Sequence, residues 1–366
     1  MNREWLQLLR LLSSGLWDRP VDKVVFFGPT DWNGVFTFAS QQTVIGLVAE
    51  AINRLPADLQ PPQEAIRQLQ MLLVQNRQRH ILLNRTLVEI TDLLQKENIH
   101  PVLLKGQGVA LNYIESALRQ CGDIDLYIGT DDYQKACIVV DRWNGKDENS
   151  QESKKHYHLC HQGVNIELHR IAECMSMPWH NARFQRWTRQ NLHGDNLRRV
   201  YINSTEINLP PFNFDVLYIF NHAWCHFIAG GISLRQLCDW ARYLHTFRTE
   251  IDRDELKKNL KAFGLWHAWQ LFGYIAVKYI GLPKEDCPFY TNWYSWQTER
   301  ILDMIQKGGN FGFFQTHVKD RPDGYWAGKW FSFKKMHHHF YRLLPICPQN
   351  VFQAWIRFLY MGVYRI

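Results

Sequence analysis

The stretch Arg119–Gly129 reads RQCGDIDLYIG and places two carboxylates one residue apart in an otherwise apolar run. Side chains two residues apart in a strand point to the same face, so Asp123 and Asp125 share one face of the expected strand. Two like charges this close repel each other unless a cation lies between them. Mg²⁺ bound by one or two carboxylates and by substrate phosphates is the common solution. We therefore interpret the pair as a metal site; the alternative is a strand start where Asp123 accepts turn amides and Asp125 pairs with an arginine.

Short strands and helices alternate around this stretch. The sequence predicts, in order, a strand over 101–104, a helix over 109–114, a strand over 124–128, a helix over 131–140 and a hairpin of 156–161 with 164–170. Thr130 is expected to cap the second helix, and Gln162–Gly163 forms the hairpin turn. This order is typical of an α+β domain with a small mixed sheet.

The regions before and after this core are expected to be helical. Residues 63–98 keep a period of 3.6 residues in their apolar positions, and the chain from Pro210 onward is again helical and rich in aromatic residues. We therefore divide the chain into a helical N-terminal region (1–95), an α+β core (96–209) and a helical C-terminal domain (210–366).

Composition limits the cellular setting and the type of ligand. The chain has 366 residues, a formal net charge of +7 and eight cysteines without a C-x-x-C pair. No apolar run approaches the roughly 18 residues that a membrane span needs, and the N-terminus lacks the apolar centre of a signal peptide. We expect a cytoplasmic protein in a reducing compartment. The mild positive charge favours an anionic ligand such as a nucleotide, a nucleic acid or a membrane surface.

Three short motifs carry a resemblance to a known family. They are Leu104-Lys105-Gly106, the run RQCGDIDL over 119–126, and Glu167-Leu168-His169. A glycine turn, a helix, a strand with two aspartates and a later acidic residue on a neighbouring strand resemble the polymerase-β-like nucleotidyltransferase superfamily. The closer resemblance is to its uncharacterised bacterial nucleotidyltransferase family. The distinctive likeness covers residues 98–244, including NHAWCHF (221–227) and LRQLCDWARYL (234–244).

The resemblance implies a Mg²⁺-dependent nucleotidyltransferase that moves an NMP from an NTP to an acceptor hydroxyl. Asp123, Asp125 and Glu167 would hold Mg²⁺ or Mn²⁺, with Glu167 also assisting deprotonation of the acceptor. The acceptor stays open: a small molecule, a sugar, a protein or an RNA. An enzyme that modifies nucleic acid would want a clear basic stripe, whereas the charges here are dispersed.

Two departures from the family pattern keep an alternative function open. Gln107 follows Gly106 where the superfamily usually has a small residue, and the third carboxylate is Glu167 rather than an aspartate. A catalytically inactive nucleotide-binding or interaction module on the same fold therefore remains the competing hypothesis.

The expected nucleotide site adds residues on both sides of the aspartate pair. Gly106 would let backbone amides approach phosphate, and Gly122 lies directly before the carboxylates. Lys105 and Arg119 would bind phosphate, although a salt bridge from Arg119 to one of the two aspartates is the competing role. His169 shares the strand face of Glu167 and would orient a carboxylate or touch substrate, or else be purely structural.

Four residues of the later helical half are expected at the cleft. His222 and His226 have a helical i, i+4 spacing that can bind zinc, but H-E-x-x-H is absent, so a hydrogen-bonded pair facing the cleft is the better interpretation. Arg235 and Asp239 have the same spacing with opposite charges. Their alternative is an ion pair on one helix.

The C-terminal region combines basic and aromatic side chains. His337–His339 lie among Lys334, Lys335 and Arg342, and the chain ends in FQAWIRFLYMGVYRI (352–366). Such a segment can lie on a membrane surface, but more often it packs on its own domain.

Overall fold

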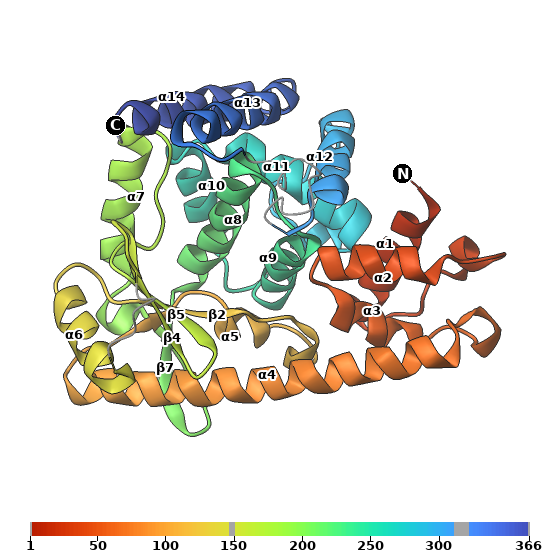
Figure 1. Ribbon diagram of the computed structural model, residues 1–366, viewed down its shortest axis with the longest axis horizontal. Coiled ribbons are helices and arrows are strands. Elements are labelled where there is room, and N and C mark those ends of the chain that lie inside the picture. Colours follow the sequence, from red (N-terminus) through yellow and green to blue (C-terminus); the bar gives the residue numbers. More distant parts are fainter. Residues whose placement is uncertain (1, 146–150, 311–321, 365–366) are drawn as a thin grey trace.

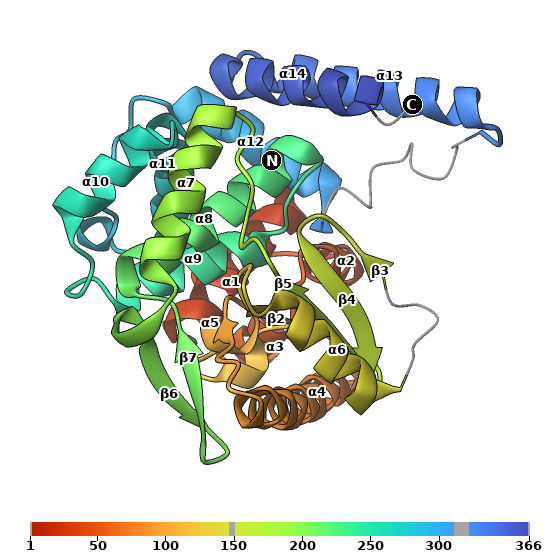
Figure 2. The same ribbon diagram turned by 90° about the vertical axis from the view of Figure 1, so that its left-hand side faces the viewer.

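A seven-stranded mixed sheet lies between helices from both ends of the chain (Figures 1 and 2). The computed structural model describes residues 2–145, 151–310 and 322–364, and the side chains up to residue 356. Residues 146–150 of the segment before the hairpin, and the side chains of 357–366 in the aromatic C-terminal segment, lie outside the described residues. The arrangement confirms the prediction of an α+β fold with helical segments on both sides of a mixed sheet.

Four helices precede the sheet: α1 (Arg3–Trp17), α2 (Trp32–Gln41), α3 (Ile45–Ile52) and α4 (Gln63–Lys96). α1 begins where the side chain of Asn2 accepts a hydrogen bond from the backbone N–H of Trp5, at 3.2 Å. Helix α4 runs along one whole side of the molecule (Figure 1). Its second half buries a leucine and isoleucine stripe against the sheet, at Leu83, Leu87, Ile90 and Leu94.

The sheet has the strand order β3-β4-β5-β2-β1-β7-β6. The strands are β1 (Val102–Leu103), β2 (Asp123–Tyr127), β3 (Gln151–Glu152), β4 (His156–His161), β5 (Val164–His169), β6 (Arg198–Ile202) and β7 (Thr205–Leu209). The pairs β2–β5 and β1–β7 are parallel, and the other four pairs are antiparallel. The β4–β5 hairpin turns at Gln162–Gly163, where both residues have positive φ, as the sequence predicted.

The two faces of the central strands differ in polarity. Ile124 and Leu126 of β2 and Ile166 and Leu168 of β5 are buried in one apolar cluster with α4 and α6 (Tyr133–Asn144). Because side chains alternate along a strand, the carboxylates between them point to the opposite face. The fold therefore presents the polar residues of β2 and β5 away from α4.

Two local predictions were wrong, and one region was not predicted. The expected helix 109–114 is the short α5 (Gln107–Ala110), because the chain turns after it and brings Tyr113 to Asp239. Helix α6 begins at Tyr133 after Asp132, and the hydroxyl of Thr130 instead donates to Asp131 Oδ1 at 3.0 Å, so Thr130 does not cap it. Between 171 and 209 the chain adds α7 (Pro178–Asn191) and the hairpin β6–β7, which the sequence did not reveal.

The C-terminal half of the chain is helical. Its helices are α8 (Phe212–Ala229), α9 (Leu234–Thr246), α10 (Arg253–Ala262), α11 (Trp266–Ile275), α12 (Ser295–Gly308), α13 (Tyr325–Leu343) and α14 (Pro348–Tyr364). Short 3-10 segments are η1 (Lys23–Phe26), η2 (Ala57–Leu59), η3 (Ser116–Leu118), η4 (Gly194–Asn196) and η6 (Lys284–Asp286), and a π-helix, η5 (Ala276–Ile280), continues α11. Ser233 and Gln236 form a capping box at the start of α9.

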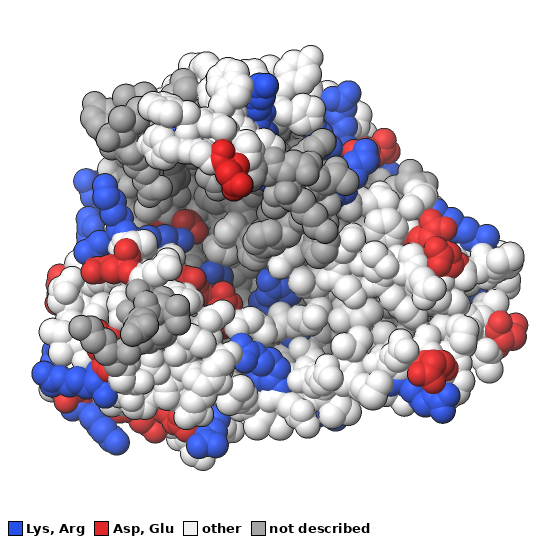
Figure 3. Space-filling model, viewed as in Figure 1, with Lys and Arg blue, Asp and Glu red and all other residues white. Residues whose placement is uncertain are grey.

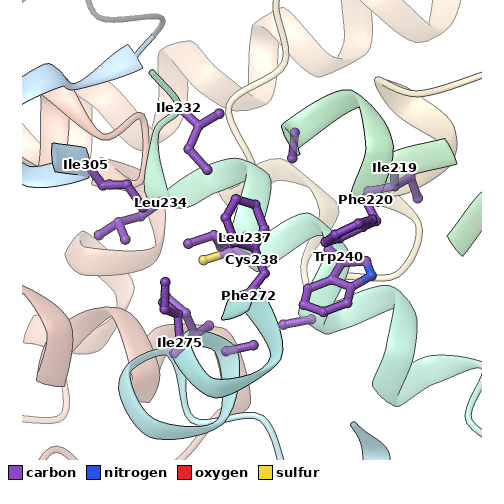
Figure 4. Close-up of a cluster of buried hydrophobic side chains, with 14 of the residues drawn as sticks. Ile219, Phe220, Ile232, Leu234, Leu237, Cys238, Trp240, Phe272, Ile275 and Ile305 are labelled. Carbon is purple, nitrogen blue, oxygen red and sulfur yellow. The ribbon is translucent and has the colours of Figure 1, made fainter. Parts of the chain in front are cut away.

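Large apolar side chains hold α8, α9 and α11 together. Phe220, Trp240 and Phe272 are fully buried and meet at the centre of this cluster, beside Leu237 and Cys238 (Figure 4). Aromatic side chains of this size bury much surface and fix the helices against one another. The cluster gives α8 and α9 the rigid support that a functional site on them needs.

Helices α13 and α14 lie side by side across the top of α8 (Figures 1 and 2). Phe340, Leu343 and Val351 are buried in the main core, whereas Trp326 and Trp330 are exposed. None of the described helices has the length and apolar character to cross a membrane. Association of this segment with a membrane surface stays a prediction.

Candidate active site

The sheet brings the three predicted carboxylates to one face. In the parallel pair of β2 with β5, Asp125 lies beside Glu167 and Asp123 lies beside Asn165. Asp123 and Asp125 are two residues apart on β2, so all three carboxylates project from the same side. The side chain of Asp125 is only 1% exposed, and that of Glu167 is 25% exposed. The group therefore has a buried end at Asp125 and a partly open end at Glu167.

His169 joins two of these carboxylates. Its Nε2 lies 2.9 Å from Asp125 Oδ1 and 3.1 Å from Glu167 Oε2. Burial lowers the pKa of His169, but the hydrogen bonds to Asp125 and Glu167 outweigh burial and raise it above its ordinary value. These two contacts fit one of the roles considered for His169, which is to orient carboxylates.

Lys105 enters from the neighbouring strand. β1 pairs with β2, and the turn after β1 places Lys105 Nζ 3.1 Å from Asp125 Oδ1 and 3.4 Å from His222 Nε2. Burial lowers the pKa of Lys105, but the surrounding carboxylates, Asp125 first, raise it above its ordinary value. The ammonium group is therefore charged and lies at the centre of the site.

The next residue, Gly106, makes this turn possible. Its φ is +57°, and a Cβ at this position would lie 2.9 Å from the carbonyl oxygen of Asp123. Any other residue would be both strained and in contact with the backbone of β2. Gly106 therefore permits the close approach of the Lys105 turn to the aspartate strand.

The two aspartates differ in their pKa shifts. The negative charge of Asp125, with burial, raises the pKa of Asp123. Burial alone would raise the pKa of Asp125 too, but Lys105 and the hydrogen bond from His169 hold it well below its ordinary value. The negative charge of Asp125 is therefore stabilised by its neighbours, whereas that of Asp123 lacks a comparable counter-charge.

Helix α8 supplies the opposite wall of the site. His222 Nδ1 lies 3.1 Å from Glu173 Oε2, and Glu173 Oε1 accepts a hydrogen bond from Lys155 Nζ at 3.0 Å. Burial, followed by the nearby charge of Lys105, lowers the pKa of His222 to about 3, so its ring is neutral. A neutral ring that donates from Nδ1 to Glu173 presents the lone pair of Nε2 to Lys105.

His226 lies one turn further along α8. Its ring meets that of His222 edge to face, with centroids 4.4 Å apart. Burial lowers the pKa of His226 to about 4. The structure therefore brings both predicted histidines to the site as neutral rings.

Arg235 also reaches the site. A small cavity of about 60 Å³ is lined by Lys105, Asp123, Asp125, His222 and Arg235, among others. The guanidinium of Arg235 donates to Thr43 Oγ1 and to the carbonyl oxygen of Gln120, both at 3.2 Å. The alternative interpretation, an ion pair between Arg235 and Asp239, is not seen among the described residues, where Asp239 pairs with another arginine.

Asp239 pairs with Arg119 instead. Arg119 Nε and Nη2 donate to the two carboxylate oxygens of Asp239 at 2.7 and 2.8 Å, and Tyr113 Oη donates to Oδ1 at 2.6 Å. Arg119 also donates to Cys121 Sγ. The expected alternative of a salt bridge from Arg119 to Asp123 or Asp125 is therefore wrong, because its guanidinium is held by a residue 120 positions away. A phosphate contact by Arg119 stays a prediction that would require this pair to open.

Two further predicted positions have clear surroundings. Gln107, where the family usually has a small residue, turns toward α4 and donates to Asn84 Oδ1 at 2.5 Å. The backbone oxygen of Gly122 accepts from Arg79, and no atom lies within 4 Å of where its Cβ would be. Gln107 thus leaves the carboxylate face unobstructed, and the space beside Gly122 is open.

The donor set fits a divalent ion. Asp125 Oδ2 is buried and has no hydrogen-bond partner among the described residues. A buried carboxylate oxygen without a partner is costly unless a cation binds it. Asp123, Asp125 and Glu167 are the residues that would hold such an ion.

A larger cavity of about 400 Å³ adjoins the site. Lys155, Glu173, Asn221, Trp224 and His226 are among its lining residues, together with side chains of α13 and α14. On the face seen in Figure 3 the surface is hollowed, with acidic and basic side chains around the hollow. Glu173 connects the two cavities, because its carboxylate contacts His222 of the smaller one.

Sequence reasoning missed Glu173, Lys155 and His156. Nothing in the local sequence distinguishes Glu173 or Lys155, because each reaches the site through a distant contact. His156 carried a usable signal: the predicted hairpin pairs it with His169, on the face of Glu167.

A family model described as uncharacterised nucleotidyltransferase matches residues 28–281 of the chain. The match spans well over half of the sequence and includes the three carboxylates and every lining residue of the smaller cavity. No curated protein and no solved structure gave a match. The chain therefore belongs to the uncharacterised nucleotidyltransferase family, and it is a transferase.

Proposed function

We propose that the protein transfers an NMP from an NTP to an acceptor hydroxyl in a reaction that depends on a divalent metal. The observation that supports it most is the placement of Asp123, Asp125 and Glu167 on one sheet face with Lys105 and Arg235 at the same cavity. Acidic ligands for a cation and basic groups for phosphate are thereby adjacent, as phosphoryl transfer requires.

The residues of the chain have separable roles in this reaction. Lys105 and Arg235 bind phosphate oxygens of the NTP and hold its α-phosphorus beside the carboxylates. A divalent ion on Asp123, Asp125 and Glu167 would neutralise phosphate charge and lower the pKa of the acceptor hydroxyl. The acceptor oxygen forms a bond to the α-phosphorus, the bond to the bridging oxygen breaks, and pyrophosphate leaves with the electron pair.

Glu167 is the group placed to accept the hydroxyl proton. It is partly exposed, and although burial opposes its charge, the hydrogen bond from His169 lowers its pKa. It is therefore ionised at neutral pH and can take up a proton transiently. Asp125 is enclosed and paired with Lys105, so it serves better as a fixed ligand.

The larger cavity is the place that we assign to the acceptor. It lies directly behind Glu173 and His226 and combines aromatic side chains with the amides of Asn221, Asn350 and Gln353. Asn221 is 1% exposed, and its Nδ2 has no hydrogen-bond partner among the described residues. A hydroxyl-bearing molecule of small size would supply that partner.

The test is transfer of label from each of the four α-labelled NTPs. Protein, NTP and Mg²⁺ or Mn²⁺ are incubated with cell extract separated into a small-molecule and a macromolecular fraction. Label should pass to one acceptor with wild-type protein and not with Asp123→Asn, whereas Asp131→Asn, an exposed aspartate near the end of β2, should behave as wild type. Saturable NTP binding without transfer in any fraction would favour the inactive nucleotide-binding module.

A further inference from the structure

Two histidines flank the third carboxylate. His156 on β4 and His169 on β5 are paired in the antiparallel register, and their ring centroids are 5.1 Å apart. Glu167 Oε2 lies 3.1 Å from His169 Nε2 and 3.7 Å from His156 Nδ1. One ligand atom from each of the three residues lies within 4.8 Å of the other two.

The two contacts of His169 Nε2 with carboxylate oxygens have the length of edges of a metal coordination shell. Neighbouring ligands of an octahedral ion with bonds of about 2.1 Å are about 3 Å apart. His169 Nε2 has this separation from both Asp125 Oδ1, at 2.9 Å, and Glu167 Oε2, at 3.1 Å. A nitrogen atom therefore lies where only oxygen atoms were expected around the ion.

The second imidazole adds an independent observation. His156 Nδ1 is buried and has no hydrogen-bond partner among the described residues, although it faces Glu167. A nitrogen that is buried beside a carboxylate is normally hydrogen-bonded. A cation shared between His156 and Glu167 would satisfy both atoms.

We propose that His156 and His169 ligate the metal ion held by Glu167, so that this position takes a transition metal such as Mn²⁺ in preference to Mg²⁺. Imidazole nitrogen suits transition metals, whereas Mg²⁺ is bound by oxygen ligands and water. This inference rests on the metal-dependent function proposed above and specifies the ligands and the metal class. The competing role for the two histidines is to orient Glu167 by hydrogen bonds, in which case no nitrogen reaches the ion.

The test uses Mn²⁺ alone as the probe and reads its ligands directly. Pulsed electron paramagnetic resonance of Mn²⁺ bound to the protein should show modulation from directly coordinated ¹⁴N, which changes to that of ¹⁵N when the protein is labelled. His156→Ala and His169→Ala should each remove one nitrogen coupling. His161→Ala, on β4 but with its side chain on the opposite face, is the matched control and should leave the spectrum unchanged.

Affinity gives a second measurement. Each histidine variant should weaken Mn²⁺ binding at least about tenfold and change Mg²⁺ binding much less. If buried His169→Ala fails to fold by circular dichroism, the partly exposed His156→Ala and the milder His169→Asn provide the measurement. Bound Mn²⁺ without nitrogen coupling, or no Mn²⁺ binding at all, would overturn the inference.

The spectroscopic result is separate from transfer. Nitrogen coupling without NMP transfer would contradict the proposed function and leave the ligand assignment standing. Transfer together with a Mn²⁺ spectrum that shows no nitrogen coupling would support the proposed function and overturn the ligand assignment.

Discussion

Two buried clusters lie close to strand β2, and each combines acidic and basic side chains. They differ in how completely their carboxylate oxygens are hydrogen-bonded. In the first, both carboxylate oxygens of Asp239 accept from Arg119, and Tyr113 donates to one of them. In the second, Lys105 and His169 both contact Asp125 Oδ1, while Asp125 Oδ2 is left without a partner among the described residues. The first cluster is closed and the second is open.

This difference suggests that the first cluster has a structural role and the second binds a ligand. A fully paired buried cluster fixes the elements that supply it, here the segment before β2 and helix α9. A partly paired cluster destabilises the folded state, because a buried polar atom without a partner costs free energy, and a bound ligand can supply that partner. The four predictions below test this division, from the largest expected effect to the smallest.

Asp125→Asn should abolish transfer. The change keeps the shape of the side chain but removes a charge that the proposed ion needs, so the rate should fall about ten-thousandfold, or by about 5 kcal/mol of barrier. The measurement is the initial rate of label transfer from the preferred NTP. Asp195→Asn, an exposed aspartate outside the site, is the control, and an Asp125→Asn protein with near-wild-type transfer would refute the metal role.

Arg119→Met should mainly lower stability. It leaves the buried carboxylate of Asp239 without its counter-charge, which typically costs about 3–5 kcal/mol. The measurement is the free energy of unfolding in urea, and Arg85→Met, which breaks the exposed Arg85–Glu89 pair, should have a much smaller effect. If Arg119→Met keeps its stability and loses NTP binding instead, Arg119 belongs to the phosphate site and the first cluster is not closed.

Lys105→Ala should weaken NTP binding about tenfold to a hundredfold. A charge-assisted hydrogen bond contributes about 1.5–3 kcal/mol, which corresponds to that range. Titration with a non-hydrolysable NTP and metal gives the affinity, with Lys135→Ala as an exposed lysine control. Equal affinities of wild type and Lys105→Ala would remove Lys105 from the phosphate site.

The smallest expected effect is on the stability of the metal-free protein. Substitution of Asp123 and of Asp125 by asparagine should change the free energy of unfolding in opposite directions. The pKa of Asp123 is raised, so its charge opposes folding above that pKa, and Asp123→Asn should be as stable as wild type or slightly more stable at pH 8. The pKa of Asp125 is lowered, so its charge favours folding above its unfolded pKa of about 4, and Asp125→Asn should be less stable at pH 8.

The effect of Asp123→Asn should fade as the pH falls through the raised folded-state pKa of Asp123 toward about 4, whereas that of Asp125→Asn should be lost only below about 4, toward the lowered folded-state pKa of Asp125. Melting temperatures in the presence of a chelator at pH 8 and at low pH measure them. Equal shifts for the two variants at pH 8 would contradict the unequal pairing of the carboxylates.

The sequence predicted the carboxylate face because its signals are local. Alternation along β2 and β5 places Asp123, Asp125 and Glu167 together once the two strands are neighbours, and the glycine turn brings Lys105 there. The pairing of Arg119 with Asp239 and the reach of Glu173 to His222 depend on helices packing across long stretches of chain. No local pattern encodes such contacts, and for the same reason α7 and the β6–β7 hairpin were missed.

Helix α4 has a consequence for motion. It extends unbroken over Gln63–Lys96 without a glycine or proline, and it contributes Leu69 to the core with the N-terminal helices and Leu87 to the core beneath the sheet. Sharp bends in helices arise mostly at proline or glycine, so this helix should behave as a stiff rod. The N-terminal helices and the sheet should then move as one body, to which the Arg119–Asp239 pair also fixes α9.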